Sequence, residues 1–88
     1  MRFRWNEWNE EHIGGHGVSP EEAEDVVLGA KQPFPRSRED KYLVWGPTES
    51  GRLLQVVFVI DPRDSVFVIH ARDLTDKEKK RYRRWRKT

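Results

Sequence analysis

The side chains with the widest chemical range in this chain are cationic or aromatic, and they gather in its second half. His70 and Arg72 stand two positions apart at the end of an apolar run, and Lys41, Arg52 and Tyr82 are further candidates. Side chains two positions apart project from the same face of a strand, so we expect His70 and Arg72 to be neighbours. A histidine titrates near neutrality and can transfer a proton. An arginine can hold a phosphate through two parallel hydrogen bonds.

These groups suit the cleavage of RNA without a metal ion or a cofactor. A 2′-hydroxyl can attack the adjacent phosphate if one group removes its proton, another protonates the leaving 5′-oxygen, and cations stabilise the phosphorane. We expect a histidine to transfer protons and Arg72 or Arg52 to hold the phosphate. The hypothesis fails if Arg52 and Arg72 lie on opposite faces of the sheet with no concave positive surface between them. The alternative is that His70 and Arg72 form only a solvated pair.

Other catalytic chemistries have less support. His12 and His16 are four positions apart, as in a zinc-binding helix, but Gly14-Gly15 interrupts the helix that would align them. The chain has no cysteine, and its four serines fall at expected caps and turns, so no nucleophilic triad is indicated. No glycine-rich loop opens a helix after a strand. We therefore expect neither a metal ion nor a nucleotide cofactor.

The charge is distributed unevenly along the chain. Residues 74–88 contain eight lysines and arginines and two acidic residues, whereas residues 1–30 contain two arginines and seven acidic residues. A helix this basic attracts phosphate or an acidic protein surface. The alternative is an ordinary solvated face, since cations near a helix C-terminus also complement its dipole. The residues expected to bind RNA are Lys79, Lys80, Arg83, Arg84 and Arg86.

The chain length and local signals predict one α+β domain over residues 1–88. Asn6 caps a first short helix, which Gly14-Gly15 ends because glycine tolerates the left-handed conformation that follows many helices. Ser19-Pro20-Glu21-Glu22 is a capping box that begins a second helix, which runs to about Leu28. We expect these two helices to pack on a sheet.

The middle of the chain is expected to form an antiparallel sheet of three or four strands, because short turns join its strands. The predicted strands are residues 41–45, 52–60 and 65–72, with 3–5 and 34–38 as candidate edge strands. Strict alternation in the last strand would place on one face Val66, Val68, His70 and Arg72, and on the other Phe67, Ile69 and Ala71. A second capping box, Thr75-Asp76-Lys77-Glu78, then begins a basic helix anchored by Leu74, Tyr82 and Trp85.

The apolar runs of the chain have the length of strands. The longest are Leu53–Leu54 and Val56–Ile60, so we expect no membrane contact. The first residues turn acidic and do not resemble a signal peptide. The absence of cysteine suits a reducing compartment, and we expect a cytoplasmic protein.

Several short motifs recur in the order and spacing of a known family. They are Phe3-x-Trp5-Asn6, His16-Gly17-Val18-Ser19-x-Glu21-Glu22-Ala23, Glu39-x-Lys41-Tyr42, Gly46, Gly51-Arg52-Leu53-Leu54 with Val56-Val57, and Ile69-x-Ala71-Arg72-x-x-Thr75-x-x-Glu78-x-x-x-Tyr82. Together they cover nearly the whole chain. In this pattern the chain resembles the BrnT-type toxins of type II toxin–antitoxin systems, although His70 replaces the small residue usual before Ala71-Arg72.

The resemblance implies a RelE-like ribonuclease fold and RNA cleavage that inhibits translation. It also implies neutralisation by a BrnA-like antitoxin protein, with DNA contacted only indirectly through the antitoxin complex. The site residues carried over by position are His16, Lys41, Arg52, Arg72, Glu78 and Tyr82. Two of them also have structural interpretations, because Glu78 completes a capping box and Tyr82 can pack the helix on the sheet. The alternative function is a non-catalytic binding module whose last helix docks on an acidic protein or on nucleic acid.

Overall fold

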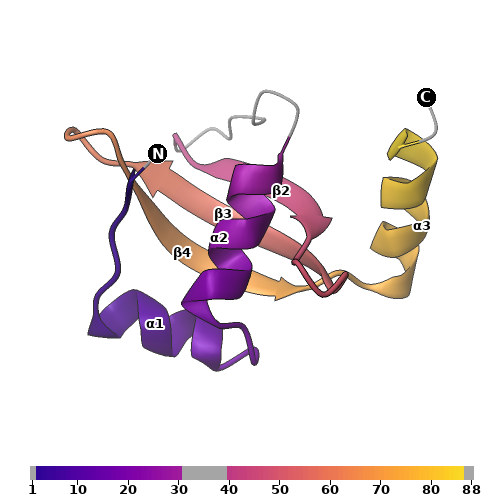
Figure 1. Cartoon of the computed structure of the whole chain (residues 1–88), viewed down its shortest axis with the longest axis horizontal. Coiled ribbons are helices and arrows are strands. Elements are labelled where there is room, and N and C mark those ends of the chain that lie inside the picture. Colours follow the sequence, from indigo (N-terminus) through magenta and orange to yellow (C-terminus); the bar gives the residue numbers. More distant parts are fainter. Residues whose placement is uncertain (1, 31–39, 87–88) are drawn as a thin grey trace.

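A computed structural model describes residues 2–30 and 40–86, and Figure 1 shows their arrangement. The described elements, in chain order, are β1 (Arg2–Phe3), α1 (Glu7–Gly14), α2 (Pro20–Gly29), β2 (Tyr42–Pro47), β3 (Leu53–Ile60), β4 (Ser65–Asp73) and α3 (Asp76–Arg86). The α+β fold class expected from the sequence is confirmed. The candidate edge strand at 34–38 lies outside the described residues.

The strands form one mixed sheet in the order β1-β4-β3-β2. The pairs β2–β3 and β3–β4 are antiparallel, as their short turns require. The prediction of a wholly antiparallel sheet is wrong at β1, which pairs with β4 in parallel through Arg2 opposite Ser65 and Phe3 opposite Val66. Helices and strands separate β1 from β4 along the chain, so no tight turn imposes an antiparallel arrangement on this pair.

Each helix begins at a residue whose side chain caps it. Asn6 Oδ1 accepts a hydrogen bond from Asn9 N, and Asn9 Oδ1 accepts one from Asn6 N. Ser19 and Glu22 exchange the same pair of bonds at the start of α2. Thr75 and Glu78 repeat the arrangement at α3. The capping boxes predicted at the second and third helices are therefore confirmed, and both helices begin where local chemistry places them.

The core lies between one face of the sheet and the two N-terminal helices. In Figure 1, α2 crosses this face and α1 lies beside β4. The sheet contributes Val44, Leu54, Val56, Phe58, Val66, Val68 and Ala71, and the helical segment contributes Ile13, Val18, Ala23, Val26 and Val27. Gly46 permits the close approach of α2, because a Cβ at this position would lie 3.5 Å from Val26. We call this side the helix-covered face and the opposite side the outer face.

A β-bulge in β4 decides which face carries the candidate site. Val57 pairs with His70, but the next residue, Phe58, pairs with Val68, so Ile69 is an extra residue. An extra residue shifts the alternation that follows it. Ala71 is therefore buried on the helix-covered face, while His70 and Arg72 project from the outer face. The prediction that His70 and Arg72 share a face with Val66 and Val68 is wrong for this reason.

α3 lies beyond the end of the sheet at which β4 ends (Figure 1). Buried Leu74 precedes it, Glu78 bonds to Arg72 of β4, and Trp85 stacks on Trp45 of β2. Glu78 and Trp85 are separated by about 10.5 Å of helix rise, which matches roughly 9.6 Å across two strand spacings. Of the three anchors predicted for this helix, Leu74 is buried and Trp85 contacts the sheet. Tyr82 contacts Arg86 of the same helix, and no residue of α3 itself is buried. Over the described residues, every helix is too short or too polar to cross a bilayer.

Candidate nucleic-acid interface

Arg52 immediately precedes β3 and reaches over the helix-covered face. Its guanidinium donates to both carboxylate oxygens of Asp73, at 2.8 and 2.9 Å. It also donates to the carbonyl of Gly17 at 2.8 Å, to the carboxylate of Glu22 at 3.2 Å, and to the carbonyl of His16 at 3.4 Å. The hydrogen bonds with Asp73 raise the pKa of Arg52 above the ordinary value of an arginine. Arg52 therefore fastens the α1–α2 loop to the end of β4.

Arg72 is on the outer face and is engaged by a different carboxylate. Its two terminal nitrogens donate to Glu78 of α3, at 2.7 and 3.0 Å. One of them also donates to Gln55 Oε1 at 3.2 Å, and the other to the Asp73 carbonyl. The hydrogen bond from Arg72, reinforced by the Thr75 backbone N–H, lowers the pKa of Glu78 to about 2. The planar fork that would hold a phosphate is occupied by a carboxylate.

The two arginines do not converge. Arg52 lies two residues before Leu54, which faces the helices, so the Arg52 side chain is on the helix-covered face. Arg72 lies opposite Gln55 on the outer face. A hollow of about 470 Å³ on the cationic side of the molecule is lined by neither of them. The expected two-arginine phosphate clamp is therefore wrong, and the nuclease hypothesis is abandoned in that form. Each arginine instead has a carboxylate partner supplied by a distant part of the chain.

The structure does bring two predicted histidines together. His16, in the α1–α2 loop, and His70, on β4, have ring centroids 5.1 Å apart in an edge-to-face arrangement. Burial lowers the pKa of His70, and the nearby charges of His16, Arg72 and His12 lower it further. His12 itself stacks on Trp8 at 4.4 Å. Residues from two separate segments thus place a histidine that favours its neutral form beside a second imidazole.

The remaining predicted catalytic residues do not join this pair. Lys41 precedes β2 at the end where Tyr42 pairs with Phe58, about 13 Å along the strands from the level of Arg72. Tyr82 is half-buried on α3, one turn after Glu78, and the guanidinium of Arg86 lies 5.9 Å from its ring centre.

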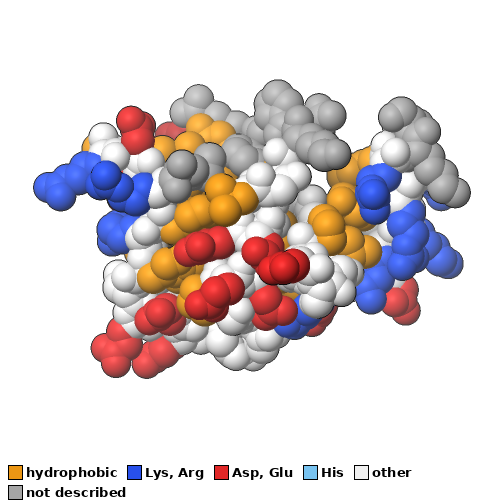
Figure 2. Space-filling view, viewed as in Figure 1, with side chains coloured by type: hydrophobic (Ala, Val, Ile, Leu, Met, Phe, Trp, Pro, Cys, Tyr) orange, Lys and Arg blue, Asp and Glu red, His pale blue; other side chains and the backbone are white. Residues whose placement is uncertain are grey.

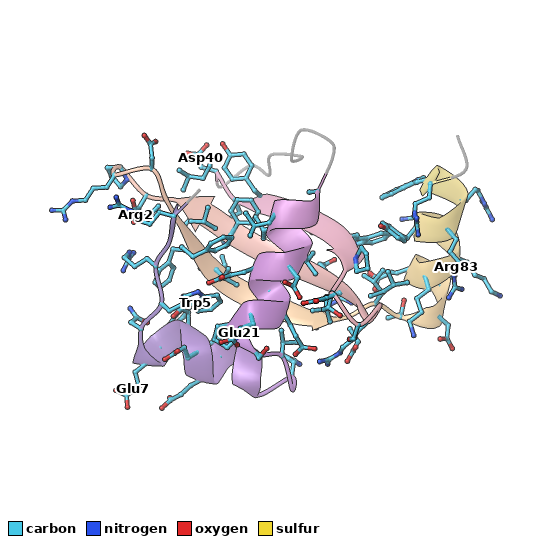
Figure 3. The ribbon with its side chains drawn as sticks, viewed as in Figure 1. Arg2, Trp5, Glu7, Glu21, Asp40 and Arg83 are labelled. Carbon is cyan, nitrogen blue, oxygen red and sulfur yellow. The ribbon has the colours of Figure 1, made fainter. Side chains whose placement is uncertain are left out.

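The other face of α3 presents unpaired cations. Within residues 2–30 and 40–86, no ion pair or side-chain hydrogen bond involves Lys77, Lys80, Arg81, Arg83 or Arg84. The hollow described above is lined by Thr75, Lys77, Glu78, Lys80, Arg81 and Arg84. Figure 2 shows blue lysine and arginine side chains over α3 and red aspartate and glutamate side chains over α1 and α2. In Figure 3, Arg83 projects from α3 away from the sheet, whereas Glu7 lies on α1 at the opposite side of the molecule and Glu21 lies on α2.

The predicted RNA-binding residues are divided between the two faces of α3. Lys80, Arg83 and Arg84 are exposed, Lys79 is half-buried near Asp73, and Arg86 lies beside Tyr82. Sequence reasoning missed two cations that line the hollow, Lys77 and Arg81. Their four-residue spacing, repeated by Lys80 and Arg84, was the signal, because residues four apart are neighbours on one helix face.

No group of three or more histidine, aspartate or glutamate side chains among the described residues is arranged to hold a metal ion. Searches of protein-family models, of curated proteins and of solved structures found no match to this chain. The relation to BrnT-type toxins therefore stays a prediction. The physical case for function depends on the histidine pair, the exposed cations of α3 and the rings beside them.

Proposed function

We propose that this chain binds RNA and that α3 supplies the phosphate-binding surface. The observation that carries the proposal is a difference between two sets of cations. Arg4, Arg52 and Arg72 of the body are each paired with a carboxylate. The exposed cations of α3 have no such partner among the described residues, although carboxylates are plentiful in the chain. Unpaired cations along one helix attract a polyanion and release its counterions on binding.

Aromatic rings among these cations favour RNA over an acidic protein. Trp85 is exposed and Tyr82 half-exposed on the same helix, and Trp45 lies under Trp85. Proteins that bind single-stranded nucleic acid combine a positive surface with rings on which bases stack. The BrnT resemblance points to the same ligand. The rival function, docking on an acidic protein, predicts that the folded chain does not bind RNA at physiological salt.

A salt series with a fluorescently labelled RNA tests the proposal by anisotropy. The variant Arg81→Ala/Arg84→Ala should weaken binding and reduce the slope of log affinity against log salt by about 1.4, roughly 0.7 for each lost single-strand phosphate contact. Arg2→Ala/Arg63→Ala is the matched control, because it removes the same charge from exposed residues of β1 and of the turn between β3 and β4, which lie across the sheet from α3 (Figure 1). Equal losses in both variants would show that only net charge matters, and α3 would not be the surface.

A second function, metal-independent cleavage of the bound RNA, is favoured by the contact between His16 and His70. In this proposal neutral His70 removes the proton of a 2′-hydroxyl, whose oxygen attacks the adjacent phosphorus. The bond from phosphorus to the 5′-oxygen breaks, a protonated His16 donates a proton to that oxygen, and a 2′,3′-cyclic phosphate remains. Such a chain would inhibit translation, and a BrnA-like antitoxin would neutralise it, as the resemblance implies.

Incubation of RNA with the protein in EDTA tests cleavage separately from binding. His16→Ala and His70→Ala should each reduce the rate by about 10²- to 10⁴-fold. His12→Ala is the control, because it removes a third histidine that stacks on Trp8 instead of joining the pair. If folded wild-type protein leaves RNA intact at low salt, the cleavage proposal is wrong. RNA binding is decided separately by the salt series.

A further inference from the structure

Trp85 is stacked on the sheet although much of it is exposed. Its side chain is 57% exposed. Its ring stacks on Trp45 with 5.0 Å between centroids and 19° between planes. Trp45 is itself fixed, since its Nε1 donates to Gln55 Oε1 at 2.9 Å, and Gln55 also accepts from Arg72. The network thus presents a large exposed aromatic surface in a defined orientation.

We infer that Trp85, supported by Trp45, is a stacking platform for an unpaired base, so that the RNA bound by α3 is single-stranded. The inference rests on the proposed RNA binding and specifies its substrate. Bases within a duplex are stacked on one another and do not offer a free face to a side chain, whereas unpaired bases stack on aromatic rings. A preorganised ring also loses little conformational freedom when a base packs on it.

The cations of α3 are placed to hold the strand that carries such a base. Lys77, Arg81 and Trp85 follow one another at intervals of four residues, about 6 Å of helix rise for each step. Residues at this spacing are neighbours on the helix surface. Lys77 and Arg81 also line the hollow along α3. A phosphate backbone in that hollow therefore brings its next base to the level of Trp85.

Trp8 provides a matched comparison within the same chain. It is 51% exposed and also stacked, on His12 and on Phe67. It lies on α1, however, where the neighbouring side chains Glu7 and Glu11 are acidic and repel phosphate. Trp8 and Trp85 thus share size, exposure and stacking but differ in the charge around them.

The test compares two ligands of equal length and charge, a short oligouridylate and an abasic ribose–phosphate strand. Trp85→Ala should weaken oligouridylate binding by about 5- to 150-fold, the range expected for one stacked base, and leave binding of the abasic strand unchanged. Trp85→Tyr should restore most of the affinity, because it retains a ring. Trp8→Ala should change neither affinity.

Four outcomes would overturn the inference. Equal weakening of both ligands by Trp85→Ala would show that Trp85 acts by holding α3 in place. An unchanged oligouridylate affinity would show that no base stacks there, and tighter binding of a duplex than of the single strand would contradict the substrate class. If wild-type protein binds neither ligand, the proposed RNA binding itself has failed, and this inference fails with it.

Discussion

Arg52 and Arg72 have the same chemistry as the exposed arginines of α3 and opposite surroundings. Arg52 and Arg72 are each held by a carboxylate in two-oxygen contact, one on each face of the sheet. Arg81, Arg83 and Arg84 extend from α3 without an acidic partner among the described residues. The first pair fastens segments of the chain together, and the second set remains available to a ligand. The carboxylates around a cation in the folded chain therefore indicate its role better than its position in a sequence motif does.

The largest expected effect on stability is at Arg52. Arg52→Ala would leave the carboxylates of Asp73 and Glu22 and the carbonyl of Gly17 without their donor. Because hydrogen bonds to charged groups contribute about 1.5–3 kcal/mol each and these are partly exposed, we expect a net loss of roughly 2–3 kcal/mol in unfolding free energy. Urea denaturation measures it. Arg83→Ala should change stability by less than about 0.5 kcal/mol, and similar values for the two variants would contradict the comparison.

Glu78 should give the next largest effect, and the effect should depend on pH. Its pKa is lowered from 4.5 to about 2 in the folded protein by the hydrogen bond from Arg72. A carboxylate with a lowered folded pKa stabilises the protein above its unfolded pKa, and this stability is lost as the pH falls from about 4.5 towards 2.

Glu78→Gln removes that contribution. We expect a loss of about 1–2 kcal/mol near neutrality, which shrinks as the pH falls through this window. Urea unfolding of the wild type and of Glu78→Gln at several pH values measures this difference in unfolding free energy. The other paired carboxylates are present in both proteins, so their contributions to the pH dependence largely cancel. A difference that stays constant from neutral to acid pH would show that Arg72 and Glu78 are not paired as described.

The stack between Trp45 and Trp85 should contribute less. Aromatic pairs are worth about 0.5–1.5 kcal/mol beyond the area that they bury. A double-mutant cycle with Trp45→Leu and Trp85→Leu should give a coupling energy in this range, measured by thermal or urea unfolding. Trp8→Leu paired with Trp45→Leu is the control cycle, because Trp8 stacks on His12 and Phe67 instead. Coupling no larger than in the control would mean that the two rings do not hold α3.

The smallest effect is on the titration of His70. Its pKa should lie below 6.5, and His16→Gln should raise it by removing a nearby positive charge. His12→Gln should raise it less, since His12 is the weakest of the contributing charges. NMR titration of the imidazole resonances measures all three proteins. A pKa of His70 above 6.5, or equal responses to the two substitutions, would contradict the contact between His16 and His70.

Local chemistry predicted the elements of this fold well. The capping boxes at Ser19 and Thr75 and the turn around Pro62 depend on residues adjacent in sequence, and each lies where it was expected. The bulge at Ile69 could not be read in the same way, because it is defined by pairing with β3. A single extra residue there moved His70 and Arg72 to the other face of the sheet.

The candidate site was predictable only in part for a related reason. The residue types were found, including the basic helix and the two histidines that the fold brings together. The hydrogen-bond partners of Arg52 are 21 to 36 residues away along the chain. The motif around Arg52 therefore does not indicate that carboxylates and carbonyls bind its guanidinium. Neither a search for cationic clusters nor strand alternation detects an ion pair that only the tertiary fold creates.

The most direct test of the central claim is an NMR titration of the folded protein with a short oligouridylate. If α3 is the RNA-binding surface and Arg52 and Arg72 are structural, the largest amide shifts should lie in Asp76–Arg86, with the indole N–H of Trp45 and Trp85 also affected. Shifts concentrated around Arg52 and the α1–α2 loop, with α3 unchanged, would contradict the account.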